Sequence, residues 1–252
     1  MNLTLSFLRN DAKLIRRDLL LLTLLGFVVY LGVVLRFLLP WANGYLAAEG
    51  LLPSESLPHP LSHYDPLVIS YMVWYTGPVL GGAIYSFLIL AEKDDGTLKA
   101  MMVTPVSPAR YIDHRIAMST VFSFAIAGFL FRVINAALVP VVPALAITAT
   151  AALTGPILML FLVLLAGSKL QGVNIGKFQS LGGLLILVSW FVEGPLQHLF
   201  GLFPPWWPSK AYWLAVDGSP WWPAYVVGGL LTQVALIVAM RRACVRSFYR
   251  EA

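Results

Sequence analysis

Six runs of apolar residues with few charges dominate this chain of 252 residues. The runs cover residues 19–39, 68–90, 111–131, 144–167, 179–193 and 223–240. Because a helix of about 20 apolar residues crosses the hydrocarbon core of a bilayer, the runs predict an all-α membrane protein with six transmembrane helices. Only 12% of the residues are charged, about half the share of a typical soluble domain. This composition excludes a soluble enzyme of the usual kind and a disordered chain.

We expect one transmembrane domain over residues 1–252, made of an interfacial helix at 1–18, a bundle at 19–240 and a basic tail at 241–252. In the first part, Leu5, Leu8, Ala12, Ile15 and Leu19 recur at helical spacing. The basic residues that fall on the opposite face are Arg9, Lys13, Arg16 and Arg17. An amphipathic helix of this kind lies in the membrane interface.

The fifth run is the shortest and ends at Glu193-Gly194-Pro195, after which an apolar stretch continues to Pro204-Pro205. A carboxylate at the centre of a bilayer costs about 2.5–3.5 kcal/mol, so Glu193 is expected at the outer boundary. The stretch 194–205 is too short to cross the membrane again. It predicts re-entrant or interfacial helices between the fifth and sixth spans, on the outer side.

Lysine and arginine residues predict the orientation of the bundle, because cytoplasmic loops carry an excess of them. One side of the bundle has only Arg36, Arg132 and Lys210. The basic residues of the other side are Arg9, Lys13, Arg16, Arg17, Lys93, Lys99, Arg110, Arg115, Lys169, Lys177, Arg241, Arg242, Arg246 and Arg250. Both termini are therefore predicted in the cytoplasm. Orientation and anionic headgroups account for the net charge of +5, so no nucleic-acid partner is expected.

The eight tryptophans all fall toward the predicted outer side. Indole rings prefer the headgroup region, so the sequence predicts an aromatic belt that anchors the protein in the membrane. The predicted belt residues are Trp41, Trp74, Trp190, Trp206, Trp207, Trp213, Trp221 and Trp222.

The predicted cytoplasmic loop at residues 91–110 has the most informative pattern. Asp95, or alternatively Thr97, can cap a short helix. The apolar face of that helix would be formed by Leu98, Met101, Met102 and Pro105, and Pro105 and Pro108 would end it. A short stiff helix joined directly to a membrane span can dock on a partner and transmit its movement.

This loop resembles the signature E-x-x-x-G-T-L-x-x-L-x-V-T-P-x-S-P of type-2 ATP-binding-cassette (ABC) exporter permeases. Its matching residues are Glu92, Gly96, Thr97, Leu98, Val103, Thr104, Pro105, Ser107 and Pro108. Lys93-Asp94 replace the Arg and Glu that are frequent in the family, and Met101-Met102 replace leucine. The stretch Asp11 to Asp18 and the segment Arg36 to Pro40 are most similar to the fluoroquinolone-export permeases.

The resemblance implies a transport subunit without its own nucleotide site. Two permeases, as a homodimer or heterodimer, would sit on two cytoplasmic ABC ATPase subunits that bind ATP and magnesium. The protein would export a compound across the plasma membrane of a bacterium. The residues implied to couple it to the ATPase are Glu92, Asp94, Asp95, Gly96, Thr97, Leu98, Lys99, Met101, Met102, Thr104 and Pro105.

No residues suited to bind ATP or a metal ion are predicted in this chain. The stretch Gly172 to Phe178 has three residues between its glycines where a phosphate loop needs four, and Phe178 replaces the Ser or Thr that binds magnesium. His59, His63 and Asp65 could bind a metal ion, but the prolines between them prevent a regular helix. A solvated loop is the better interpretation. The single cysteine, Cys244, excludes an intramolecular disulfide.

Two further groups of residues are candidates for movement and for substrate contact. Gly77-Pro78 and Gly155-Pro156 lie inside spans, where proline kinks a helix, so they are possible hinges or static kinks. The family resemblance suggests a substrate path between the first, second and fifth spans. Its candidate residues are Phe27, Tyr30, Tyr71, Trp74 and Tyr75, which could equally belong to the aromatic belt.

Two alternatives stay open beside an ATP-driven exporter of a lipophilic or amphiphilic compound. An ion-coupled secondary transporter would be expected to have inverted repeats and an acidic residue at the centre of a span, and the sequence shows neither. A haem-exporter-type permease would be expected to be shorter and to lack the proline-rich outer loop. An intramembrane enzyme is the least supported, since the spans hold only scattered Ser and Thr.

Overall fold

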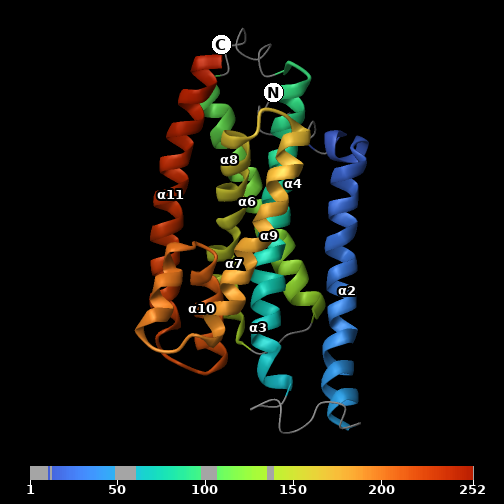
Figure 1. Cartoon of the computed structure of the whole chain (residues 1–252), viewed down its shortest axis with the longest axis vertical. Helices are drawn as coiled ribbons and strands as arrows, with labels where there is room; N and C mark the ends of the chain where they lie inside the picture. Colours follow the sequence, from blue (N-terminus) through green and yellow to red (C-terminus); the bar gives the residue numbers. More distant parts are fainter. Residues whose placement is uncertain (1–10, 12, 49–60, 98–106, 135–138, 252) are drawn as a thin grey trace.

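The computed structural model describes residues 11, 13–48, 61–97, 107–134 and 139–251. These residues form a bundle of helices that run side by side, and they contain no strand (Figure 1). The all-α prediction is therefore confirmed. The helices are α2 (Leu19–Ala48), η1 (Leu61–Tyr64), α3 (Asp65–Ile69), η2 (Ser70–Thr76), α4 (Gly77–Asp94), α6 (Pro108–Ile134), α7 (Val141–Ala152), α8 (Thr154–Leu165), α9 (Lys169–Phe191), η3 (Pro195–Leu202), α10 (Trp206–Val216) and α11 (Trp222–Glu251).

Within the described ranges, five helical stretches are long and apolar enough to cross a membrane. They are Leu19–Tyr45, Ser62–Asp94, Pro108–Ile134, Val141–Leu165 and Trp222–Phe248. Helix α9 has 23 residues, which suffices for a span at about 1.5 Å per residue. It is not one of the five, because polar residues such as Lys177 lower its hydropathy. The six-span layout stays a prediction.

The bundle has two chemically different ends. At the charged end, drawn at the top of Figure 1, α4 and α11 end and α6 and α9 begin. At the aromatic end, drawn at the bottom, α9 ends and η3 and α10 fill the interval before α11. Asp11 and the last turns of α11 both lie at the charged end.

Several helices are longer than the predicted apolar runs, and α2 and α11 show this at their C-terminal ends. Helix α2 continues through Pro40 to Ala48, although the first span was expected to end at residue 39. The proline removes only its own N–H from the ladder, and the helix accommodates this loss near its end. Helix α11 extends to Glu251, so most of the predicted tail from 241 is helical. No glycine or proline follows Gly229, and the Arg and Ala residues of this segment favour helix.

Small residues let α4, α6 and α8 pack very closely. A Cβ atom on Gly82 would lie 2.9 Å from the Gly155 Cα atom, and one on Gly81 would lie 2.9 Å from the Ser123 Cα atom. The Ser123 hydroxyl donates a hydrogen bond of 3.1 Å to the Pro78 carbonyl oxygen. Any larger side chain at these glycines would push the helices apart.

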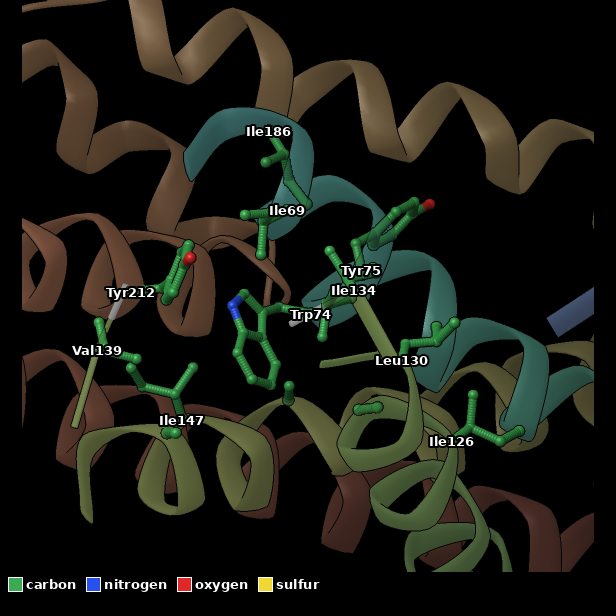
Figure 2. Packing of buried hydrophobic residues seen from close by; sticks show 14 of the residues in the cluster. Ile69, Trp74, Tyr75, Ile126, Leu130, Ile134, Val139, Ile147, Ile186 and Tyr212 are labelled. Carbon is green, nitrogen blue, oxygen red and sulfur yellow. The ribbon is translucent and has the colours of Figure 1, made fainter. Parts of the chain in front are cut away.

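Three of the tryptophans predicted in the membrane belt lie inside the protein instead. Trp74, Trp206 and Trp213 are buried. The Trp74 ring lies 5.3 Å from the Phe131 ring and 5.6 Å from the Tyr212 ring, at the centre of the core shown in Figure 2. These large rings fill the space between short helices that offer few long aliphatic side chains.

The belt prediction still fits other tryptophans. Trp41 and Trp221 are exposed on the surface of the bundle.

The indole N–H of the buried Trp213 donates a 2.9 Å hydrogen bond to the Ser70 hydroxyl, which satisfies its polar group inside the protein.

Candidate functional site

A tight turn at the charged end begins the predicted coupling segment. Helix α4 ends at Asp94, and Asp95 forms its C-cap. Gly96 follows with φ of +70°, and its N–H donates a 3.2 Å hydrogen bond to the Lys93 carbonyl oxygen. Glycine is the residue that adopts this left-handed conformation without strain, which explains its place in the pattern.

Asp95 therefore ends one helix, and its predicted role as the N-cap of the next one is not seen in the described contacts. Thr97 has helical backbone conformation and is exposed. The remaining predicted coupling residues lie outside the described residues, and they are Leu98, Lys99, Met101, Met102, Thr104 and Pro105.

A buried ionic network fixes the base of this turn. Arg115 of α6 is 1% exposed and forms an ion pair with Glu92 of α4. Its Nη1 atom donates a 2.7 Å hydrogen bond to Asp11 Oδ1, and its Nε atom donates one of 3.1 Å to the Tyr111 hydroxyl. The Tyr111 hydroxyl in turn donates to Glu92 Oε2. One guanidinium group thus joins three segments of the chain.

The network changes the interpretation of Glu92, which the family resemblance implies to be a coupling acid. Glu92 is 9% exposed and Asp11 is 2% exposed, so neither carboxylate is presented at the surface. Burying an ion pair costs desolvation energy, and removing one partner leaves an uncompensated buried charge. Glu92 is therefore placed to hold the turn rigidly against α6 and against the helical stretch before α2.

The start of α9 is attached to the same turn. The backbone N–H of Lys169 donates a 2.9 Å hydrogen bond to Asp94 Oδ2, and the Ser168 hydroxyl accepts one of 3.3 Å from the Gln171 N–H as the N-cap. A carboxylate at a helix N-terminus is favourable because of the helix dipole. Asp94 thereby links the end of α4 to the beginning of α9.

The side chain of Lys169 extends this connection to α2. Its Nζ atom pairs with Asp18 Oδ2, and Asp18 Oδ1 accepts a 3.0 Å hydrogen bond from the Leu20 N–H at the start of α2. Burial raises the pKa of Asp18, but the bonds from Lys169 and from the backbone outweigh burial and leave this pKa below its ordinary value. A further ion pair at this end joins Arg241 of α11 to Asp113 of α6.

The basic face predicted for the N-terminal helix is present in the part that the structure describes. Lys13, Arg16 and Arg17 are exposed, while Leu14 and Ile15 between them are partly covered. Arg9 lies outside the described residues. This pattern agrees with a helix that rests one face on the protein and turns its charges outward.

Helix α9 separates two apolar cavities in the middle of the bundle. The first has a volume of about 480 Å³ and lies between α2, η2, α4, α8 and α9. The second has a volume of about 560 Å³ and lies between η2, α8, α9 and α11. On α9, Val173, Gly176 and Lys177 face the first cavity and Ile175 and Gly182 the second, and at 100° per residue these sets lie on opposite sides of the helix.

Three of the five predicted path residues line the first cavity. They are Phe27 of α2 and Tyr71 and Tyr75 of η2, and the two tyrosine rings lie 5.7 Å apart. Glycine brings the tyrosines against α9, since a Cβ atom on Gly183 would lie 2.7 Å from the Tyr75 Cε1 atom. The only charged residue among those lining this cavity is Lys177, within the described part of the chain.

The other two predicted path residues are not brought to the cavity. Trp74 is fully buried in the core and points to a different side of η2 from its neighbour Tyr75, as Figure 2 shows. Its position follows from the turn of the helix, which points consecutive side chains in different directions around the axis. Tyr30 is 63% exposed and does not line the cavity.

The two predicted hinge pairs lie where the helices change character. Residues Ser70–Thr76 form a π-helix directly before Gly77-Pro78, and the Gly77 N–H bonds to the Met72 carbonyl five residues earlier. Helices α7 and α8 are separated at Leu153, two residues before Gly155-Pro156. Both pairs are buried in the close contact between α4, α6 and α8. Movement at these points stays a prediction.

Sequence reasoning identified Glu92 and missed its partners as functional residues. Tyr111 and Arg115 are four residues apart on α6, and Asp11 lies 104 residues before Arg115. Arg115 falls inside an apolar run, where a charge must be paired. A charged residue inside an apolar run was therefore the available signal, although it could not show which acid is the partner.

Comparison with known proteins places the chain among transport proteins. The family described as "Fluoroquinolones export permease protein Rv2686c-like" matches residues 11–241. Two curated relatives are the fluoroquinolones export permease proteins MT2760 and Rv2686c, from the CDC 1551 / Oshkosh and H37Rv strains of Mycobacterium tuberculosis. This chain is 29% identical to each over 247 residues, which cover 94% of this chain and 92% of the relative. No solved structure matches the chain significantly.

Proposed function

The chain belongs to the Rv2686c-like family of fluoroquinolones export permease proteins, and from this membership we propose that it is the membrane subunit of an ATP-driven exporter. Relatives named as export permeases indicate a membrane transport protein. The finer proposal is that a separate ABC ATPase, carrying ATP and magnesium, drives export of a lipophilic or amphiphilic compound.

The observation that carries the proposal is the set of ion pairs and hydrogen bonds that fixes the turn at the charged end. The turn after α4 is held by Glu92 and Asp94 to α6, to α9 and to the helical stretch before α2. A force applied to this turn by a docked ATPase would reach all of these segments, because the ion pairs and the helix cap leave it little freedom to yield. The charged end is accordingly proposed to face the cytoplasm, with α9 as the fifth of six spans.

The first cavity is the proposed substrate path. Its walls are apolar and aromatic, and Lys177 supplies a positive charge on α9. This lining suits an aromatic amphiphile that carries an anionic group, and the relatives' name specifies fluoroquinolones, which are such compounds. In a dimer of permeases, α2 would bring this cavity close to the second subunit.

The test is transport by the purified permease together with candidate ABC ATPases in proteoliposomes. The amount of a fluoroquinolone in the vesicle lumen should increase only when ATP is supplied on the side of the charged end. Uptake driven by an ion gradient without ATP would contradict the proposal and would favour the secondary transporter.

A variant pair tests the role of the turn. Gly96→Val places a β-branched side chain at a φ of +70°, where it is strained, and it should at least halve ATP-dependent uptake. Gly128→Val is the control, because a Cβ atom at Gly128 meets nothing within 4 Å. If the two variants transport equally well, the turn does not transmit the force.

A further inference from the structure

A third cavity, at the aromatic end, differs from the other two in being lined by carboxylates and aromatic side chains together. Its volume is about 680 Å³, and its walls come from η1, from the end of α9 and the linker after it, and from α10. It lies apart from the proposed substrate path, with which it shares no lining residue.

Aromatic rings form one continuous wall of this cavity. The rings of Trp190 and Trp213 meet edge to face at 4.9 Å, and the His63 ring lies 5.8 Å from the Trp190 ring. The hydrogen bond from Trp213 to Ser70 fixes the orientation of the Trp213 ring. Aromatic rings attract cations through their negative faces, most strongly where water is partly excluded.

The charged residues that line the same cavity are two acids and one lysine, namely Glu193, Asp217 and Lys210. Lys210 lies near Asp217, and although burial lowers the pKa of Lys210, the Asp217 carboxylate acts in the opposite direction. Glu193 is exposed and accepts no hydrogen bond or ion pair from the part of the chain that the structure describes. One lysine beside two carboxylates leaves this lining with an excess of negative charge, and Glu193 can attract a positive charge.

We propose that this cavity binds an organic ammonium ion, which lies against the rings of Trp190 and Trp213 and beside the carboxylate of Glu193. The ammonium group can belong to a soluble amine or to a lipid headgroup such as phosphatidylethanolamine. The site does not depend on ATP or on any partner, so it goes beyond the proposed function and can be tested without it.

The test is calorimetric titration of the full chain, in nanodiscs of phosphatidylglycerol, with 1-phenylpiperazine. Its neutral analogue 4-phenylmorpholine, which has the same shape without the charge, should bind about tenfold more weakly. The Glu193→Gln variant should weaken binding of 1-phenylpiperazine about tenfold as well. Asp95→Asn, at the other end of the bundle, is the matched control and should bind like the unchanged protein.

A variant that is expected to tighten binding distinguishes a change in binding from a folding defect. Lys210→Met removes the positive charge from the wall and should tighten binding of 1-phenylpiperazine. Equal binding of the charged and neutral probes, or no change in either variant, would overturn the proposal. Nanodiscs that contain phosphatidylethanolamine identify the source: competition with the probe indicates a lipid headgroup, and an unchanged affinity indicates a soluble amine.

Discussion

The two ends of the bundle differ in whether their carboxylates are buried and paired or exposed. At the charged end, Glu92 and Asp11 are buried and both pair with Arg115. At the aromatic end, Glu193 and Asp217 are exposed and line a cavity of about 680 Å³. The first arrangement fixes helices relative to one another, whereas the second leaves charge available to a ligand.

This difference suits the two ends to the separate tasks that we propose for them. A network of buried charges that pair with one another resists deformation, because separating any pair leaves a charge in a medium of low polarity. Exposed carboxylates contribute little to stability, and they are free to attract ions from outside. The charged end is thus suited to transmit force, and the aromatic end to recognise small molecules.

The largest expected effect tests the contrast directly. Arg115→Met should lower the free energy of unfolding by about 3–5 kcal/mol, because it leaves two buried carboxylates without a cation. Thermal unfolding of the purified chain in one detergent measures the change. Arg241→Met breaks a partly exposed pair with Asp113 and should cost about 0–1 kcal/mol. Glu193→Gln should not lower the unfolding temperature. A decrease as large as that caused by Arg115→Met would contradict the proposed difference between the two ends.

A smaller loss of stability is expected for a substitution between the two ends, at the contact between helices α4 and α8. Gly82→Ala would place a methyl group 2.9 Å from the Gly155 Cα atom, and overpacking of this kind costs about 1–3 kcal/mol. Gly128→Ala meets nothing within 4 Å and serves as the control in the same unfolding assay. Equal stability of both variants would show that the contact between α4 and α8 yields easily, and that it could not carry movement from one end to the other.

Removal of the cap on α9 should have a still smaller effect on stability. Asp94→Asn weakens the bond to the Lys169 N–H and should cost about 0.3–1 kcal/mol, as expected for a charge at a helix terminus. Thermal unfolding should show this loss, and ATP-dependent uptake should fall as well if the cap transmits movement to α9. Asp95→Asn, one residue further on and exposed, should leave the unfolding temperature unchanged.

The smallest effect depends on pH. The pKa of Asp18 is lowered in the folded protein, so its carboxylate stabilises the fold above its unfolded pKa of about 3.9. That contribution disappears as the pH falls through the lower folded value. Asp18→Asn should therefore reduce stability by about 0–1 kcal/mol at pH 7 and by nothing once Asp18 is protonated. A difference in unfolding temperature that persists in strong acid would show that Asp18 acts through something other than its charge.

Local patterns explain what could be predicted from the sequence. Apolar runs locate the long helices because a span is a local property. Gly96 was identified through the family signature, and its φ of +70° explains why glycine stands there. The length of α2 was underestimated because proline is a poor guide near a helix end. Burial of Trp74 was missed because an indole ring suits a protein core as well as a membrane boundary.

The network at the charged end shows where such reasoning stops. Glu92 was identified by its place in a motif, but Asp11 and Arg115 come together only through the packing of helices that are far apart in the chain. Cavities also depend on packing: the family resemblance supplied three residues that line the cavity beside α9, and the aromatic cavity was not predicted at all. Only the chemistry of individual residues, such as Glu193 at a boundary, was available beforehand.

The position of α9 has a consequence for its mechanics. Its two flanking cavities, of about 480 and 560 Å³, share Tyr75 and Leu158 as lining residues and lie on opposite sides of the helix. A lateral shift of α9 toward either α2 or α11 narrows one cavity while it widens the other, so the total void is nearly conserved. Hydrostatic pressure acts on differences in volume, and it should therefore hardly disturb the balance between two positions of α9, even where it unfolds the protein as a whole.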